Sequence, residues 1–237
     1  MNALFNFSRE SVTQFLLSLP VILLALTVHE VSHGWMAMKL GDPTARNLGR
    51  LTLNPLKHLD PIGTICMIFF HFGWAKPVPI NVRYFKKPRR DMALTALAGP
   101  VSNFIMGFLG VVLYMVFRSL FNVYVFMNNG HIVYQAFSSD ILSNIKIIVT
   151  LFFLFFAWLN LSLGTFNLIP IPPLDGSRIF LTFLPPKYYF GIMKYERYIM
   201  LGFMILLYTG IVTTPLTWVV SAIFNGMSSL VGLIPGL

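Results

Sequence analysis

Long runs of uncharged, mostly apolar residues divide the chain. No residue carries a charge from Ser11 to Val28, from Met92 to Phe117, from Ile147 to Leu174 or from Tyr198 to Leu237. A helix needs about 20 consecutive apolar residues to cross a bilayer, and each run approaches or exceeds that length. Pro215 is expected to divide the last run, because proline interrupts a helix. The pattern predicts helices at about residues 12–40, 92–118, 145–169, 198–213 and 216–235.

The pattern changes between the first two of these helices. Residues 61–75 are uncharged but short for a simple span, which favours a re-entrant or tilted segment, with a full span as the alternative. Residues 50–54 alternate polar and apolar side chains, which is typical of a strand. Residues 76–81 contain two prolines, and the residue before a proline favours extended chain. We therefore expect a short re-entrant or β-hairpin-like insertion between the first two core helices.

The composition agrees with an all-α polytopic membrane protein. Of the 237 residues, 56% are hydrophobic and 11% are charged. Soluble proteins have about 45–50% apolar and 25% charged residues. No soluble insert of domain size interrupts the chain, so we predict one membrane-embedded domain over residues 1–237 with about five to six transmembrane helices. The single cysteine, Cys66, excludes an intramolecular disulfide.

The basic residues indicate how the chain is oriented. The net charge is +9, and most Lys and Arg residues lie in 41–91 and 175–197, whereas residues 119–139 contain none. Basic loops stay on the cytoplasmic side of a membrane. We therefore expect residues 119–139 and the N-terminus to be external. This distribution explains the net charge without a nucleic-acid partner, and the lipid bilayer is the expected environment.

One short motif at the end of the first run carries chemistry. In His29-Glu30-Val31-Ser32-His33 the two histidines are four residues apart, so on a helix both imidazoles face the same way and can bind one metal ion. Glu30 is turned by about 100°, where its carboxylate can reach a water molecule on the metal. Ionisable groups inside a bilayer are costly and indicate a functional site. The motif predicts a zinc hydrolase.

A third metal ligand is needed, because catalytic zinc takes three protein ligands and keeps one position open. Asp175 follows the proline-rich break Asn167–Leu174, which cannot be helical and precedes Gly176. From the residues alone, Asp175 is equally well a metal ligand or the cap of a short helix starting at Gly176. The carboxylates expected to be solvated are Glu10, Asp42, Asp60, Asp91, Asp140 and Glu196.

These motifs together resemble the site-2 protease family of intramembrane zinc metalloproteases. The match rests on His29–His33 and on Asn167–Gly176, and further motifs support it in the expected order. These are Gly49-Arg50-Leu51-Thr52-Leu53-Asn54-Pro55, Asp60-Pro61-Ile62-Gly63-Thr64, Gly73-Trp74-Ala75-Lys76-Pro77-Val78-Pro79-Ile80-Asn81 and Ala98-Gly99-Pro100-Val101-Ser102-Asn103-Phe104. The chain resembles the compact bacterial branch, without a PDZ domain or a CBS-type nucleotide-binding domain.

The resemblance implies a set of site residues. His29, His33 and Asp175 are then the ligands of one Zn²⁺ per chain, and Glu30 is the catalytic base. Asn167 is implied to lie beside the active site and to act on the substrate backbone. For Asn103 the residues themselves favour helix packing, with a role at the site as the alternative.

The predicted function is hydrolysis of peptide bonds within or near the transmembrane segments of membrane proteins, in a bacterial plasma membrane and near its cytoplasmic side.

The extended residues 50–54 and 77–81 are either ordinary turns or an edge on which an unwound substrate pairs. The alternative function is an inactive pseudoprotease that binds membrane segments without cutting them. A metal transporter is disfavoured, because the helices at 92–118 and 198–213 offer few polar residues.

Overall fold

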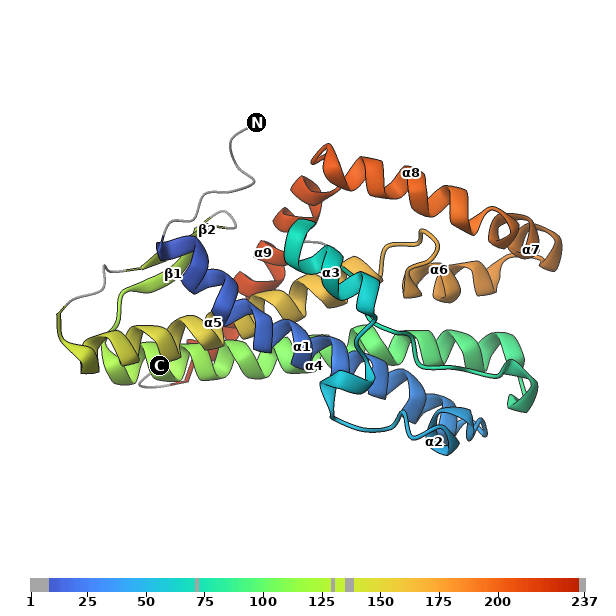
Figure 1. The fold of residues 1–237 in the computed structure, drawn as a ribbon, viewed down its shortest axis with the longest axis horizontal. Helices are drawn as coiled ribbons and strands as arrows, with labels where there is room; N and C mark the ends of the chain where they lie inside the picture. Colours follow the sequence, from blue (N-terminus) through green and yellow to red (C-terminus); the bar gives the residue numbers. More distant parts are fainter. Residues whose placement is uncertain (1–8, 71–72, 129–130, 135–138, 235–237) are drawn as a thin grey trace. The chain divides into compact units, whose positions relative to one another are not determined.

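The computed structural model describes residues 9–70, 73–128, 131–134 and 139–234, and in these residues it is mostly helical (Figure 1). The α-helices are α1 (Arg9–Lys39), α2 (Thr44–Asn47), α3 (Pro61–Phe70), α4 (Pro88–Phe121), α5 (Ile141–Asn167), α6 (Asp175–Phe180), α7 (Pro186–Lys194), α8 (Glu196–Tyr208) and α9 (Thr213–Val231). The strands are β1 (Val125–Asn128) and β2 (His131–Tyr134). Three single-turn 3-10 helices lie at Pro55–Lys57, Val82–Tyr84 and Leu181–Phe183.

Three helices of the described part are long and apolar enough to cross a membrane. These segments are Gln14–Lys39 of α1, Pro88–Phe121 of α4 and Ile141–Asn167 of α5.

The break between the last two helices lies at a different position from the one that the sequence predicts. Residues 209–212 separate α8 from α9, and Pro215 lies in the first turn of α9 instead of at the break. A proline is tolerated in that turn, because its missing N–H has no helical partner there.

The insertion between α1 and α4 is built differently from a hairpin. The helix α3 has 10 residues, so it is about 15 Å long and cannot cross a hydrocarbon core of about 30 Å by itself. Its flanks meet in one antiparallel bridge between Leu59 and Ala75, and the Lys76 N–H donates to the His58 carbonyl at 2.8 Å. Of the predicted segment 61–75, residues 71–72 lie outside the described part.

The two-stranded sheet is formed not by this insertion but by the segment of the chain that connects α4 to α5 (Figure 1). β1 pairs antiparallel with β2 in the register Val125↔Tyr134 to Asn128↔His131. The Tyr114 hydroxyl of α4 donates to the Val125 carbonyl at 2.8 Å and so attaches the sheet to this helix. The sequence prediction treated this stretch as a loop.

The described residues form two compact units. The first contains the described residues up to Leu23, Ile105–Ser162, and the described residues from Thr217 on. Inside it α4 and α5 approach closely at two glycines: a Cβ at Gly107 would lie 2.6 Å from a Leu161 methyl carbon, and one at Gly110 would lie 2.7 Å from the Ala157 backbone. Small residues permit such close contact between helices.

The second unit contains Leu24–Phe104 and Leu163–Leu216, and it holds all of the predicted site residues. Here the insertion packs on α1, because a Cβ at Gly34 would lie 2.7 Å from a Leu51 side-chain carbon. The helices α5 and α8 meet through Phe166 and Phe203, whose ring centroids are 5.8 Å apart.

Two carboxylates in this unit differ from the expectation that they are solvated, because both Asp42 and Asp91 are buried. Asp42 accepts the backbone N–H of Asn81 at 2.7 Å, which ties the end of the insertion to the end of α1. Asp91 accepts the Lys87 N–H at 2.9 Å and pairs with Arg90 at 2.7 Å, at the start of α4. Both carboxylates therefore have structural partners at helix ends.

Candidate metal centre

Three potential metal ligands from two distant parts of the second unit converge. His29 and His33 lie on the same face of α1, and Asp175 is the first residue of α6. The Nε2 atoms of the two histidines are 3.0 Å apart. The Asp175 Oδ2 lies 3.1 Å from the His29 Nε2 and 3.2 Å from the His33 Nε2. Both histidines are buried, with exposed fractions of 4% and 7%.

The proline-rich break brings Asp175 to this position. After α5 ends at Asn167 the chain turns, and α6 begins with the Ser177 N–H donating to the Leu174 carbonyl at 3.0 Å. Gly176 has no room for a side chain, since a Cβ there would lie 2.3 Å from the Leu168 carbonyl oxygen. The Asp175 carboxylate is therefore directed to the histidines by a turn that packs against its own backbone.

The spacing of the three ligand atoms fits a tetrahedral metal site. Zinc–nitrogen distances of about 2.0–2.1 Å place neighbouring tetrahedral ligand atoms roughly 3.3 Å apart. The observed separations of 3.0, 3.1 and 3.2 Å match one face of such a tetrahedron. The Asp175 Oδ2 is buried and has no hydrogen-bond partner in the described part of the chain. A cation at the centre would satisfy all three atoms at once.

The far side of each imidazole is held by α4. The His33 Nδ1 lies 2.7 Å from the Thr95 carbonyl oxygen, and the His29 Nδ1 lies 2.6 Å from the Asn103 Oδ1. A carbonyl oxygen can only accept, so the Nδ1 of His33 carries its proton and donates. The Nε2 of a neutral His33 then presents a lone pair to the centre, as a metal ligand must.

Glu30 lies beside the centre and is held by the insertion. Its Oε2 accepts the Val78 backbone N–H at 2.8 Å. Asn81 is bound to Asp42, and Pro77 and Pro79 have no N–H, so residues 77–81 offer few free backbone donors to a paired strand. The insertion therefore holds Glu30 through the Val78 N–H, and both interpretations of residues 77–81, ordinary turns and a strand edge for a substrate, stay predictions.

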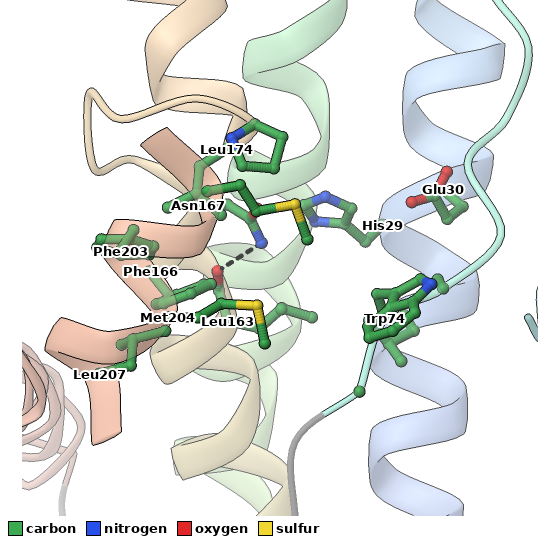
Figure 2. Close-up of a pocket in the computed structure, with 15 residues that line it drawn as sticks. His29, Glu30, Trp74, Leu163, Phe166, Asn167, Leu174, Phe203, Met204 and Leu207 are labelled. Atoms are coloured by element: carbon green, nitrogen blue, oxygen red, sulfur yellow. Dashed lines mark hydrogen bonds between the residues drawn. The ribbon is translucent and has the colours of Figure 1, made fainter. Parts of the chain in front are cut away.

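A cavity of about 200 Å³ opens next to His29 and Glu30. Figure 2 shows that His29 and Glu30 project from α1 and that Trp74 approaches from the insertion. The apolar lining includes Phe166 and the α8 side chains Met200, Phe203, Met204 and Leu207. A mostly apolar cavity with a few polar groups at one end is the usual form of a ligand site.

Asn167 also lines this cavity (Figure 2). Its Nδ2 donates to the Leu163 carbonyl at 3.0 Å, within α5. An amide carries a second N–H, which remains as a donor for a ligand in the cavity.

Sequence reasoning missed the supporting groups around the centre. Asn103 contacts His29, whereas the sequence favours helix packing for it and keeps a role at the site as the alternative, and no sequence pattern points to the Thr95 carbonyl or the Val78 N–H as a partner. A signal was present for α4: Thr95, Gly99 and Asn103 recur every four residues, so they share one helix face.

The chain is similar to known zinc metalloproteases. Residues 17–209 match the model of Peptidase family M50. The "Putative zinc metalloprotease YwhC" of Bacillus subtilis is 40% identical over 188 residues, which cover 79% of this chain and 78% of that protein. The "Putative zinc metalloprotease Rip2" of Mycolicibacterium smegmatis is 28% identical, with 68% of this chain and 55% of the relative covered. The "Zinc metalloprotease MJ0392" of Methanocaldococcus jannaschii is 26% identical, with 73% and 35% covered. No solved structure is a significant match.

Proposed function

The chain belongs to peptidase family M50, the site-2 protease family of zinc-dependent peptidases, and we propose that it hydrolyses peptide bonds within or near transmembrane segments of membrane proteins. The observation that carries this proposal is the meeting of three metal-ligand atoms beside a mostly apolar cavity, on helices apolar enough to cross a membrane.

In this proposal His29, His33 and Asp175 hold one zinc ion through the two Nε2 atoms and the Oδ2. Two neutral imidazoles and one carboxylate are a donor set that zinc takes in hydrolases. Bound there, zinc supplies Lewis-acid chemistry, activating water and polarising a carbonyl.

Glu30 acts as the general base. Because its Oε2 accepts the Val78 N–H, its Oε1 is the oxygen that removes a proton from the attacking water and later delivers it to the leaving amine. Asn167 donates its second N–H to the oxyanion that develops on the substrate carbonyl. Contacts of this type contribute about 3–4 kcal/mol to other hydrolases.

The cavity supports the substrate class. Its phenylalanine, methionine and leucine side chains favour apolar residues beside the scissile bond, such as those of a membrane-spanning segment. The polar end formed by Glu30 and Asn167 faces the peptide group.

The membrane setting completes the proposal. We place one protease domain of about five to six transmembrane helices in a bacterial plasma membrane, with the site near the cytoplasmic side. The basic residues of 41–91 and 175–197 support this orientation, since they lie at the ends of α1 and α5 that carry the site.

The test compares the purified wild type with Glu30→Gln on a single-span membrane protein reconstituted in liposomes. We expect Glu30→Gln to keep one zinc per chain and to lose cleavage, because an amide cannot take the proton. Glu196→Gln is the matched control and should retain both, since Glu196 pairs with Arg178 at 4.0 Å instead of lining the cavity.

Cleavage by Glu30→Gln at the wild-type rate would exclude Glu30 as the base. A wild type that captures single-span proteins and cuts none of a panel from one genome would instead identify a pseudoprotease.

A further inference from the structure

The face of α4 that carries Thr95, Gly99 and Asn103 receives both histidine rings. His29 and His33 are four residues apart on α1, and the three α4 residues follow the same spacing. A Cβ at Gly99 would lie 2.5 Å from the His33 Nε2 and 2.6 Å from the His29 Cε1. The two rings therefore lie directly against the Gly99 backbone, between Thr95 and Asn103. We call these three residues the histidine-supporting face.

A hydrogen bond to the Ala25 backbone orients the amide of the Asn103 side chain. Asn103 is fully buried, and its Nδ2 donates to the Ala25 backbone carbonyl at 3.3 Å. Because a backbone carbonyl can only accept, the NH₂ end of the amide must face Ala25. The Oδ1 end then faces the His29 Nδ1 at 2.6 Å.

That orientation determines the tautomer of His29. The Asn103 Oδ1 has no hydrogen to give, so the His29 Nδ1 must donate, and the Nε2 of the neutral ring keeps its lone pair toward Asp175. The Thr95 carbonyl imposes the same tautomer on His33. Without these acceptors a neutral histidine can place its proton on Nε2, and it then has no lone pair on that atom with which to bind a metal at the centre.

We propose that Asn103 is a positioning residue that sets the zinc affinity of the centre by holding the tautomer and ring plane of His29. This inference rests on the proposed metal site and deepens it. Partners of this kind, when removed from metal-binding histidines, change metal affinity by about 10- to 100-fold.

The experiment measures zinc affinity of the purified full chain by competition with a chelator, so it does not depend on cleavage. Asn103→Leu keeps a similar volume and removes the acceptor, and we expect its zinc affinity to fall by about 10- to 100-fold. Asn103→Asp keeps an acceptor oxygen toward His29, and as a buried neutral carboxyl group it also keeps a donor toward the Ala25 carbonyl, so its affinity should remain within about threefold of the wild type.

Asn160→Leu is the matched control. Asn160 is another buried asparagine in a long helix, and its Nδ2 donates to the Phe156 carbonyl of α5 at 2.8 Å. It does not line the cavity or the centre, so its substitution should leave zinc affinity unchanged even if it lowers the melting temperature.

A cobalt-loaded sample gives a second reading. The visible absorption of Co²⁺ reports ligand geometry, and Asn103→Leu should alter its bands, whereas Asn103→Asp and Asn160→Leu should keep the wild-type spectrum.

Wild-type affinity and spectrum in folded Asn103→Leu would overturn the proposal. If Asn103→Leu does not fold, Asn103→Asp decides, because loss of zinc by that folded variant would equally overturn the proposal and retention supports it. A wild type that binds no zinc would instead overturn the proposed function.

Discussion

At the scale of single residues, Gly99 shows how little space the metal centre leaves. Its missing side chain is what lets the two imidazoles approach α4, because a Cβ would lie 2.5 Å from the His33 Cε1. Ring atoms of a histidine held at both nitrogens cannot give way without losing a bond. The glycine is therefore required by the site, although glycine costs a helix interior about 1 kcal/mol relative to alanine.

This geometry gives a prediction for Gly99→Ala. The added methyl group should displace His29 and His33 and lower zinc affinity by at least about tenfold, by the same loss of ring orientation that removing a supporting partner causes. Zinc content after equilibration with a chelator measures the effect. Gly226→Ala is the control, because a Cβ at Gly226 in α9 would have no neighbour within 4 Å. Unchanged zinc binding by Gly99→Ala would show that the rings do not need this close contact.

The residues of the site differ in how far the sequence predicts them. The pair His29 and His33 can be read from spacing, because their relation is local to one helix. From the residues alone Asp175 is equally well a helix cap, and only the resemblance favours it as a ligand; in the structure its Oδ2 lies within 3.2 Å of the Nε2 atoms of both histidines. The contacts of Asn103 and Val78 join segments far apart in the chain, so a local pattern such as the four-residue spacing around Asn103 can mark a face but cannot identify its partner.

At the scale of elements, the turn between α5 and α6 positions the third ligand. It closes on itself so tightly that a Cβ at Gly176 would meet two backbone oxygens, at 2.3 Å from Leu168 and 2.5 Å from Ile169. Backbone atoms cannot rotate away as a side chain can. The position of Asp175 therefore depends on the residue that follows it.

We accordingly expect Gly176→Ala to shift α6 and carry Asp175 away from the histidines. Overpacking of this kind costs about 1–3 kcal/mol, so zinc affinity and the melting temperature should both fall. Thermal unfolding in detergent, with and without added zinc, measures both effects. The matched substitution is Gly191→Ala in α7, where no described atom beyond the adjacent residues and the backbone of its own helix lies within 4 Å of the new Cβ. A Gly176→Ala protein as stable and as rich in zinc as Gly191→Ala would contradict this account of the turn.

The elements also divide into those that a sequence pattern predicts and those that it does not. The long helices follow from uncharged runs, because burial in lipid requires apolar side chains over the whole length. The short helices α2, α6 and α7 have 4, 6 and 9 residues, and helices this short depend on tertiary contacts. For the β1–β2 sheet the sequence does contain a local signal, because an Asn-Gly pair between two apolar stretches favours a two-residue hairpin loop.

At the scale of the whole molecule, the polar bonds that join different elements around the centre lie in the second unit. There His29 contacts Asn103 and Glu30 contacts Val78. In the first unit, the Tyr114 hydroxyl of α4 also joins a second element, through the Val125 carbonyl of β1, whereas Thr150 donates within its own helix. What distinguishes the second unit is that its cross-element bonds hold ionisable side chains, which are costly to bury in a membrane and therefore indicate where function is concentrated.

The distribution of basic residues over the whole molecule predicts how the chain is oriented in the membrane. If α1, α4 and α5 each cross the membrane, the connection between α4 and α5 lies opposite the basic residues of 41–91. In a Cys66→Ala background, which removes the single native thiol, Ser139→Cys and Lys57→Cys provide exposed reporters on the two sides. A charged maleimide that does not cross membranes should label Ser139→Cys in right-side-out vesicles and Lys57→Cys in inverted ones. Lys187→Cys, also exposed, should behave as Lys57→Cys does, because residues 175–197 belong to the basic side. Labelling of Lys57→Cys and Lys187→Cys in right-side-out vesicles would reverse the orientation and place the metal centre near the external face.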